Sequence, residues 1–212
     1  MSLNTDFNEK QIEILLVAET LFADNGFEGT SIRTIAKEAK INVAMVSYYF
    51  GSKDKLLEAL VVYRTKDLRF EMAHLSTENL DPIEKIKKVI DLYINRINCN
   101  KGIFRIIHFE LTKGKESSKI KALDEIRYAN LLSLTSIIEE GQSKGIFRKD
   151  VIIPLIPPTI LGTFFHFHIN KMYFQEILNL KTEESFDNYI KTTLSKHIQQ
   201  TINALLTYDI AH

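Results

Sequence analysis

Helical periodicity runs through nearly the whole chain. Apolar residues recur every three or four positions, and no segment shows the strict alternation that is typical of a half-buried strand. Of the 212 residues, 45% are hydrophobic, which is enough for a real core in one or two domains. The pattern predicts an all-α fold of about nine helices. They are expected at residues 9–25, 30–40, 42–50, 52–75, 82–97, 102–114, 117–142, 158–178 and 184–206.

Helix-stop and helix-start residues divide the N-terminal part into short pieces. Gly26 is predicted to end the first helix, and Gly51 the third. Thr30 and Asn42 are predicted N-caps of the second and third helices, because their side-chain oxygens can accept a hydrogen bond from a free backbone N–H. Ser52 has the same predicted role in the fourth helix. The second and third helices are therefore only two to three turns long.

The two short helices point to a DNA-binding element. Helices of this length are marginal in water, so the longer amphipathic segments 9–25 and 52–75 are expected to support them. Two short helices joined by a tight turn on a helical frame describe a helix-turn-helix, whose second helix enters the DNA major groove. We therefore predict that residues 42–50 form a recognition helix.

The outward face of that helix suits DNA contact. We expect Ala44, Met45 and Ser47 to contact base edges and Tyr48 to donate a hydrogen bond to a backbone phosphate. None of these side chains is a carboxylate that would repel phosphate. The opposite face is predicted to be buried and consists of Val43, Val46 and Phe50.

Charge near this element is locally positive, although the chain as a whole has 27 basic and 27 acidic residues. Residues 30–69 contain eight basic and four acidic side chains, whereas residues 1–29 contain one basic and six acidic ones. Lys53 lies in the first turn of the fourth helix, where the helix dipole disfavours a cation unless an anion such as phosphate binds there. Lys53 and Arg33 are therefore added to the predicted DNA-binding residues.

Residues 10–60 resemble the N-terminal part of TetR-type (tetracycline-repressor-like) transcriptional regulators. The matching stretches are "LFADNGFEGTS" and "SIRTIAKEAKINVAMVSYYFGSKDKLL". The later stretch "EEGQSKGIFRKD" is similar to the family's ligand-binding core in a less specific way. The resemblance implies an all-α homodimer that reads a pseudo-palindromic operator and releases it when a small-molecule effector binds. It also places Tyr48 and Lys53 at phosphate-contacting positions and Thr30 at the start of the second helix.

The chain departs from the family pattern at two positions. Lys40 occupies a turn position where the family commonly has glycine, and a left-handed residue other than glycine costs about 1–2 kcal/mol. The turn is therefore expected to be slightly strained or to have a different shape. Ser47 stands where a tyrosine is frequent, so an operator sequence cannot be transferred from relatives. The predicted domain division is residues 1–52 for DNA binding, a bridging helix at 53–75, and residues 76–212 for effector binding and dimerisation.

Dimerisation is expected to use the last two helices. Segment 158–178 is apolar on all sides, and such a helix must be buried on all sides. Pairing with the same helices of a second copy is one solution, and it would give a four-helix interface. The predicted interface residues are Phe164, Phe167, Phe186, Ile190, Leu194, Ile198 and Ile202.

An effector pocket is predicted where polar side chains lie among aromatic ones. The candidates are Phe104, His108, Tyr128, Phe165 and His168. His166 and His168 do not predict a metal site, because residues two apart on a helix point about 200° apart. Neither a metal nor another cofactor is expected. Cys99, the single cysteine, excludes an intramolecular disulfide, and a redox role for it remains open.

Other classes of protein have less support in the sequence. It contains no phosphate-cradling glycine loop, zinc-helix motif or nucleophile elbow, so an all-α enzyme is the weaker alternative. A helix-turn-helix regulator that answers to a protein partner, or an activator without a ligand, also remains open. The most apolar run, 151–169, contains three prolines and two histidines and is a poor membrane span. No secretory signal is visible, and we expect a soluble, cytoplasmic protein.

Overall fold

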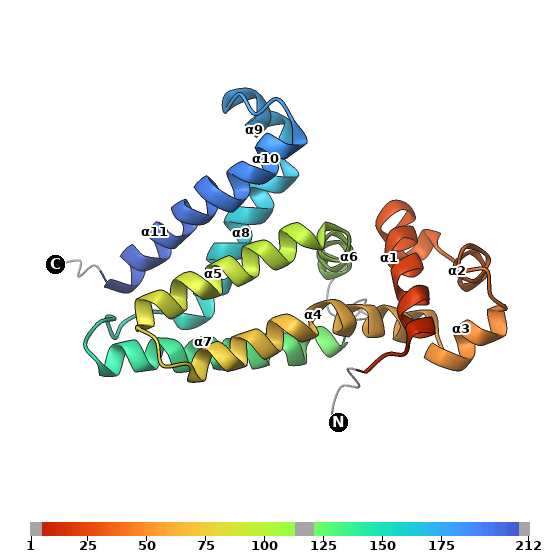
Figure 1. The fold of residues 1–212 in the computed structure, drawn as a ribbon, viewed down its shortest axis with the longest axis horizontal. Coiled ribbons are helices and arrows are strands. Elements are labelled where there is room, and N and C mark those ends of the chain that lie inside the picture. The colour runs from red at the N-terminus through yellow and green to blue at the C-terminus, as the bar shows by residue number, and fades with distance from the viewer. Residues whose placement is uncertain (1–5, 113–120, 208–212) are drawn as a thin grey trace. The chain divides into compact units, whose positions relative to one another are not determined.

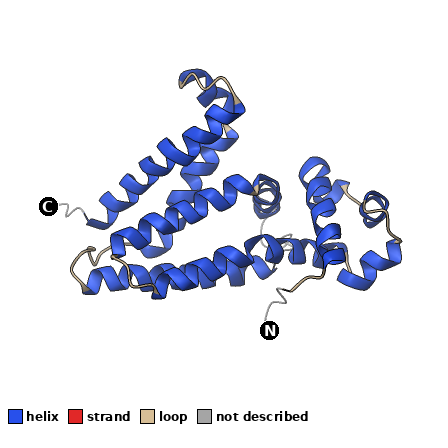
Figure 2. Ribbon diagram, viewed as in Figure 1, coloured by secondary structure: helices blue, strands red, loops and turns tan. Residues whose placement is uncertain are grey.

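A computed structural model of the protein describes residues 6–112 and 121–207. These residues are helical and contain no strand, as Figures 1 and 2 show, so the predicted all-α class is confirmed. The elements are α1 (Glu9–Gly29), α2 (Ile32–Glu38), α3 (Val43–Phe50), α4 (Lys53–Thr77), α5 (Pro82–Cys99), α6 (Lys101–Thr112), α7 (Lys121–Ser143), η1 (Ile153–Leu155), α8 (Ile156–Ile169), α9 (Lys171–Ile177), α10 (Glu183–Tyr189), η2 (Ile190–Leu194) and α11 (Ser195–Thr207).

The chain folds into two compact units. Unit 1 comprises the described residues of Met1–Asp67 and Asn100–Tyr128, and unit 2 those of Leu68–Cys99 and Ala129–His212. Helices α4 and α7 each begin in unit 1 and end in unit 2. Helix α6, which the sequence-based division assigns to the effector domain, packs with the N-terminal helices instead. The functional division at residues 75–80 stays a prediction.

Unit 1 has one apolar core built from the buried faces of its helices. Helix α1 begins at Asn8, whose side chain accepts from the Gln11 amide while the Gln11 side chain accepts from the Asn8 amide. Gly26 has φ 73° and interrupts the helical backbone, so the predicted stop is confirmed as a kink. The fully buried large side chains of this core are Ile14, Leu15, Phe22, Phe27, Ile35, Leu56, Leu57 and Leu60.

Unit 2 is a bundle in which α5 packs against α8 and α11 (Figure 1). Pro82 starts α5, as predicted, and the apolar stripe of that helix is buried along its length at Ile86, Ile90, Ile94 and Ile97. Two side-chain hydrogen bonds join α5 to neighbouring helices. Lys85 donates to Glu140 of α7 at 2.7 Å, and Ser195 of α11 donates to Asp91 at 2.7 Å.

The C-terminal helices differ from the predicted ranges. The helix expected at 158–178 is two helices, because it is interrupted at Asn170. The Asn170 side chain donates to the carbonyl of His166 at 2.9 Å, which gives the last turn of α8 a partner outside the regular helix ladder. The helix expected at 184–206 is helical throughout but contains a π-helical stretch, η2, between α10 and α11.

No helix among the described residues is long and apolar enough to span a membrane.

Candidate nucleic-acid interface

The start of α2 differs by one residue from the prediction. Ser31, not Thr30, is the N-cap, because its hydroxyl accepts from the Thr34 amide at 3.0 Å. Thr30 is only 2% exposed, and its hydroxyl lies within hydrogen-bonding distance of the carbonyls of Leu21, at 3.1 Å, and Gly26, at 2.9 Å. It therefore closes the end of α1. A buried hydroxyl that bonds to carbonyls cannot reach a phosphate, so Thr30 is removed from the predicted DNA contacts.

The turn between α2 and α3 is closed by two backbone hydrogen bonds. The amide of Ile41 donates to the Ala36 carbonyl at 3.0 Å, and the amide of Lys40 donates to the Lys37 carbonyl at 3.1 Å. This is the Schellman pattern, in which the residue after the C-cap takes a left-handed backbone. Lys40 has φ 52° and occupies that position, where glycine would fit without strain. The structure therefore places Lys40 at a left-handed position, and the strain expected there stays a prediction.

Helix α3 is defined by caps at both ends. Asn42 accepts from the Ala44 amide at 2.9 Å, as predicted for the N-cap. At the other end Gly51 has φ 77°, and its amide donates to the Ser47 carbonyl at 2.8 Å. Short caps of this kind stop α3 after about two turns, and Ser52 then accepts from the Lys55 amide at 3.2 Å at the start of α4.

The two faces of α3 divide nearly as the sequence predicts. Val46 and Phe50 are buried, whereas Val43 is 39% exposed and does not belong to the core as expected. Val43 is the first residue of the helix, and only Val46 and Phe50 of α3 are buried. Tyr48 is 83% exposed, Ala44 and Ser47 are exposed, and Met45 is half-buried. The face predicted to meet base edges is therefore mostly open to solvent.

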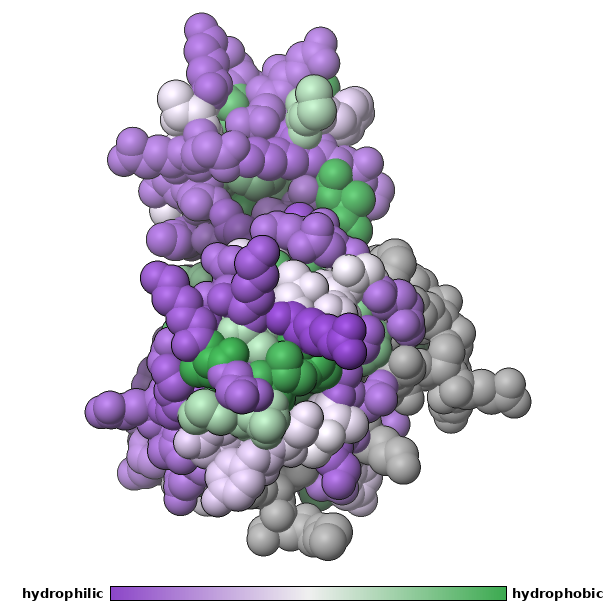
Figure 3. Space-filling view, turned by 90° about the vertical axis from the view of Figure 1, so that its right-hand side faces the viewer, coloured by the Kyte–Doolittle hydropathy of each residue, from purple (hydrophilic) through white to green (hydrophobic). Residues whose placement is uncertain are grey.

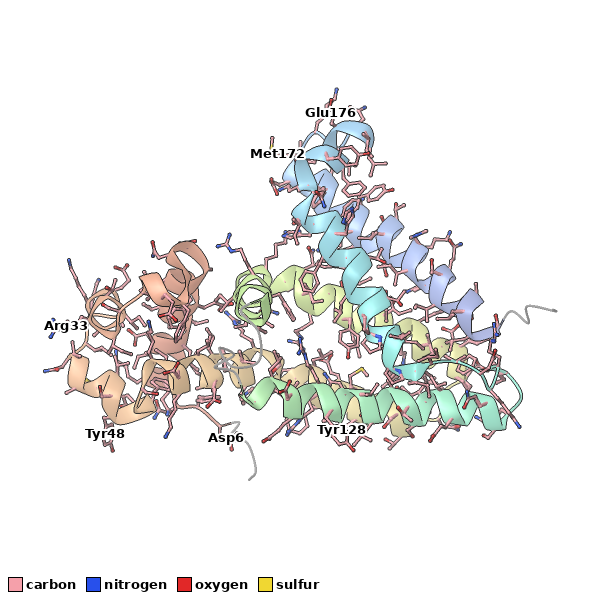
Figure 4. The ribbon with its side chains drawn as sticks, turned by 180° about the vertical axis from the view of Figure 1, so that it is seen from behind. Asp6, Arg33, Tyr48, Tyr128, Met172 and Glu176 are labelled. Atoms are coloured by element: carbon pink, nitrogen blue, oxygen red, sulfur yellow. The ribbon has the colours of Figure 1, made fainter. Side chains whose placement is uncertain are left out.

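The figures show this surface directly. Arg33 and Tyr48 project from the outer edge of unit 1 in Figure 4. In the lower block of Figure 3, hydrophilic side chains surround a small apolar area. Arg33, Lys37 and Lys40 are all exposed, which gives the α2 segment and its turn three solvated positive charges. Apolar contacts for a thymine methyl group and cations for phosphates are both available on this side.

Lys53 has a structural role that the sequence did not reveal. Its ammonium group donates to the carbonyls of Phe27, at 2.9 Å, and Thr30, at 3.0 Å, and lies 4.3 Å from the centre of the Phe27 ring. It thereby ties the end of α1 to the start of α4. A carboxylate oxygen of Glu28 lies 3.9 Å from the same ammonium group, so three protein groups already surround it. Phosphate contact by Lys53 stays a prediction.

Helix α1, which supports the helix-turn-helix, also contacts α4 and α6. Glu19 of α1 is 8% exposed and accepts two hydrogen bonds from Arg64 of α4, at 2.6 Å and 2.8 Å. Gly102 of α6 lies against Glu19, so that a Cβ at this position would come within 3.4 Å of its carboxylate. Arg105, one turn further along α6, donates to the Ala23 carbonyl. Helix α6 therefore contacts the support of the helix-turn-helix.

The predicted effector-pocket residues are not brought together. Phe104 packs against the core of unit 1, and His108 lies on α6 with its side chain outside the described residues. Tyr128 is 64% exposed and projects from the outer side of α7 in Figure 4. Phe165 and His168 belong to unit 2. The Phe165 ring packs edge-on against the Phe164 ring, and the His168 ring stacks on it. The effector pocket formed by these five residues stays a prediction. The exposed side chain of Tyr128 is poorly placed to line an interior site.

The predicted dimer-interface residues lie mainly in the core of unit 2, and their role in a dimer stays a prediction. All seven are buried within a single chain, with exposed fractions between 0% and 6%. Phe167, for example, stacks on Phe186 at 5.1 Å and on Tyr189 at 5.5 Å. These side chains form the core between α8, α10, η2 and α11, and only Phe167 and Leu194 among them also line the groove described below. The sequence pattern identified an apolar face but not which surface covers it.

A groove in unit 2 lies over that core. It has a volume of about 660 Å³ and runs between α8, α9 and the segment from α10 to α11. Its polar or small lining residues are Gly162, Thr163, His166, Thr193 and His197. Sequence analysis missed this surface, because the π-helical stretch that places Thr193 has no clear sequence signal.

Two buried asparagines of unit 2 were missed as well. Asn98 of α5 and Asn130 of α7 are 7% and 5% exposed. Burial raises the pKa of the Tyr93 phenol on α5 to about 12, and the side chain of Asn130 partly offsets that rise. The position of Tyr93 in the apolar stripe of α5 was visible in the sequence, but its polar partner on a distant helix was not.

Fold and surface together define a class of protein. Helix α3 is a capped helix of two turns that is buried on one side and exposed on the other, and a tight turn joins it to α2. This is the architecture of a helix-turn-helix DNA-binding protein. A separate helical unit accompanies it.

Comparison with known proteins identifies the family. Residues 14–60 match the model of bacterial regulatory proteins of the tetR family, and residues 82–202 match that of the tetracyclin repressor-like C-terminal domain. The chain belongs to the TetR family of bacterial transcriptional regulators. It is 30% identical over 141 residues to the HTH-type transcriptional repressor NicS of Pseudomonas putida, and the aligned part covers 66% of each chain.

Solved structures agree with this fold. The ketosteroid transcriptional regulator KstR2 of Mycobacterium tuberculosis superposes with a TM-score of 0.71 at 15% identity, over 98% of this chain and 100% of that one. FadR of Bacillus subtilis in complex with stearoyl-CoA superposes with a TM-score of 0.67 at 21% identity, over 92% and 97%. At these identities the likeness concerns the fold.

Proposed function

We propose that the protein is a homodimeric repressor that binds a pseudo-palindromic operator through α3 and leaves it when a small apolar effector binds in unit 2. The observation that carries the DNA-binding part is the open face of α3, with Tyr48 83% exposed beside Ala44 and Ser47. The opposite face is fixed by buried Val46 and Phe50. A helix held in this way can enter the major groove without rearrangement.

The operator is expected to have two half-sites. Two recognition helices of a symmetric dimer dock productively when they lie about 34–36 Å apart, which is one turn of DNA. Ala44, Met45 and Ser47 are proposed to contact bases, whereas Arg33, Tyr48 and Lys53 are proposed to contact phosphates.

Selection of binding sites from random duplex DNA, followed by affinity measurements on the enriched sequence, tests this proposal. We expect an enriched inverted repeat and affinity that falls steeply with salt. Met45→Ala should change the preferred bases without abolishing binding. Failure to enrich any sequence, with a folded protein in the assay, would contradict specific DNA binding.

The dimer is proposed to form across the unit 2 groove, whose lining includes Phe167 and Leu194 of the predicted interface. Gly162 and Thr163 on α8 and Thr193 near α11 are small, which would allow close approach of helices from a second copy. Several apolar side chains near this end of unit 2 also need cover, since Ile169, Met172 and Ile177 are 63%, 85% and 55% exposed. Met172 projects from the tip of the unit in Figure 4. A two-fold dimer would place identical surfaces against each other.

Effector binding is proposed to act through the helices that connect the units. Helices α4 and α7 run from one unit into the other, and α6 joins α5 of unit 2 to the support of the helix-turn-helix at Glu19 and Ala23. A ligand that favours one arrangement of unit 2 would change the separation of the two recognition helices. Paired spin labels at position 48 of both protomers, with and without effector, measure that separation; an unchanged distance would rule the mechanism out.

A further inference from the structure

The groove of unit 2 has a lining whose charge depends on histidine. Among the described residues that line it, three can titrate: His166 on α8, Tyr189 on α10 and His197 on α11. The other lining residues include no aspartate, glutamate, lysine or arginine, and most of them are apolar or aromatic. Phenols ionise only near pH 10, so protonation of the two histidines is the charge change that this lining can undergo near neutral pH.

Charged residues on the elements around the groove lie outside its lining. They are Lys171 and Glu176 on α9, Lys181 in the following loop, Glu183, Glu184 and Asp187 on α10, Lys191 in η2 and Lys196 on α11. Lys171 and Glu183 pair with each other, and Glu176 lies at the tip of the unit in Figure 4. On α5, which packs against α8, η2 and α11, Asp91 accepts from Ser195 and Gln199 instead. A charged histidine in the groove would therefore have no carboxylate beside it in the lining.

Both histidines are exposed in the single chain and lie on the face that a second copy would cover. His166 follows Gly162 by four residues on α8, and His197 follows Thr193 by four residues, so each shares a helix face with a small lining residue. His168, the other histidine of α8, stacks on Phe164 and does not line the groove.

The neighbours of His166 favour its neutral form. Its ring lies edge-on to Phe174, with 6.1 Å between the ring centres. The side-chain nitrogen of Asn170 lies 3.4 Å from Nδ1 of His166 and also donates to the His166 carbonyl at 2.9 Å. An amide donor beside Nδ1 suits a ring that carries no proton on that nitrogen, whereas an imidazolium ring carries one on both nitrogens.

We propose that proton binding to His166 and His197 separates the dimer, so that the protein dimerises at neutral pH and dissociates in mildly acidic solution. The proposal rests on the proposed function, in which two copies pack across the groove. Two-fold symmetry brings both histidines of each copy into one interface. A self-complementary surface repels itself when it becomes charged, and this lining has no carboxylate to offset the imidazolium groups.

The direction of the pH effect follows from proton linkage. An imidazole that is solvated in the monomer and enclosed in the dimer binds its proton more weakly in the dimer. Dimerisation is therefore at full strength above the ordinary histidine value of about 6.5 and weakens as the pH falls below it. Each enclosed ring raises the dissociation constant about tenfold at pH 5.5. Two fully enclosed rings thus raise it about a hundredfold, and all four raise it about 10,000-fold.

Sedimentation equilibrium of the full-length protein at pH 7.5 and pH 5.5 tests the proposal. The solutions contain EDTA, so that a metal ion bridging histidines does not contribute. The dissociation constant should rise at least about a hundredfold at the lower pH, where ordinary carboxylates remain ionised. Circular dichroism should show the same helical signal at both pH values. Dissociation that accompanies loss of this signal would mean unfolding and would overturn the proposal.

The informative variant is His166→Gln combined with His197→Gln, because it keeps neutral polar side chains at two exposed positions and removes their titration. It should dimerise equally at both pH values. The opposite variant, His166→Lys combined with His197→Lys, carries permanent charges and should be monomeric even at pH 7.5. His74→Gln, at an exposed position of α4 outside the groove, is the matched control and should keep the full pH effect.

Two results would contradict the role of the histidines directly. They are a native dimer that is equally tight at both pH values and a double glutamine variant with the full native pH effect. If the double variant does not dimerise at pH 7.5, the single glutamine variants decide, because each should lose part of the effect and a full effect in both would overturn the proposal.

The position of the interface is tested separately with Gly162→Trp, whose indole would block a second copy on the groove. If this variant is monomeric while the native dimer is insensitive to pH, the histidine proposal is wrong and the proposed dimer stands. If it remains dimeric, the interface lies elsewhere and both proposals fail.

Discussion

Single residues decide how the recognition helix is presented. Tyr48 and Lys53 were both predicted to contact phosphate, yet the structure gives them very different surroundings. The Tyr48 side chain is 83% exposed, whereas the Lys53 ammonium group already bonds two carbonyls. Their substitutions should therefore separate a purely DNA-contacting residue from one that also supports the fold.

Tyr48→Phe removes one exposed hydroxyl and nothing else. The melting temperature should stay unchanged, because an exposed hydroxyl is satisfied by water. Operator affinity should fall about five- to tenfold at constant salt, since one phosphate hydrogen bond is lost. Fluorescence anisotropy with labelled operator measures this. Tyr128→Phe, at a 64% exposed position on α7, is the control and should bind normally; an equal loss there would refute the assignment.

Lys53→Ala should lower both stability and DNA affinity. Loss of two hydrogen bonds from a charged donor is expected to cost about 1–3 kcal/mol, observed as a lower denaturation midpoint. Affinity should weaken similarly on all duplex sequences, and the salt slope should fall by about one. Lys55→Ala, two residues further along at an exposed position, should leave stability unchanged. An effect of Lys53→Ala restricted to one sequence would contradict a phosphate contact.

At the scale of elements, caps and turns determine where each helix begins and ends. The sequence placed the caps at Asn42 and Ser52 correctly, because a short polar side chain before an apolar period is a local signal. It misplaced the cap of α2 by one residue, since Thr30 and Ser31 offer the same hydroxyl and only the packing of α1 shows which one is buried.

Lys40→Gly tests strain in the turn. Lys40 has φ 52°, so glycine should relieve the left-handed penalty and stabilise the protein by about 0.5–1 kcal/mol after the larger unfolded-state entropy of glycine is included. DNA affinity should nevertheless fall, because an exposed positive charge is lost. Lys37→Gly removes the same charge inside α2 and should destabilise the protein by about 1 kcal/mol. Equal stability changes in the two variants, measured by urea unfolding, would contradict a strained turn.

Glu140→Gln tests the link between α5 and α7. Hydrogen bonds from Lys144 and Lys85 lower the pKa of Glu140 below its ordinary value of 4.5. Its folded-state pKa is depressed, so the stabilisation is present above the ordinary value and disappears as the pH falls through the depressed one. Glu140→Gln should cost about 1–3 kcal/mol at pH 7, because buried Lys85 loses its partner.

The difference between native protein and Glu140→Gln should shrink as the pH falls below 4.5, which urea unfolding at a series of pH values measures. Glu139→Gln, an exposed neighbour on the same helix, provides the control and should have little effect at any pH. A difference that stays constant down to strongly acidic pH would show that the charge of Glu140 is not responsible.

At the scale of the whole molecule, the proposed dimer surface can be tested without disturbing the monomer. A Cβ at Gly162 would meet no atom within 4 Å in the single chain, so Gly162→Trp should fold normally. The same indole would obstruct a second copy that packs on the groove. Analytical ultracentrifugation should therefore show a shift from dimer to monomer, together with loss of operator binding. Glu139→Trp, exposed on α7, should remain dimeric; a dimeric Gly162→Trp would place the interface elsewhere.

The sequence by itself determined the all-α class, the helix-turn-helix and the exposed face of α3, because caps, glycine stops and apolar periods act over a few neighbouring residues. Only the tertiary structure decided which apolar faces are covered within the chain and which polar atoms meet. Phe186, Ile190 and Ile202 proved to be intrachain core, Lys53 a link between α1 and α4, and Asn130 a buried partner of Tyr93. Periodicity records that a side chain is apolar or polar, but the surface that meets it comes from residues far away in the chain, and no local pattern encodes that choice.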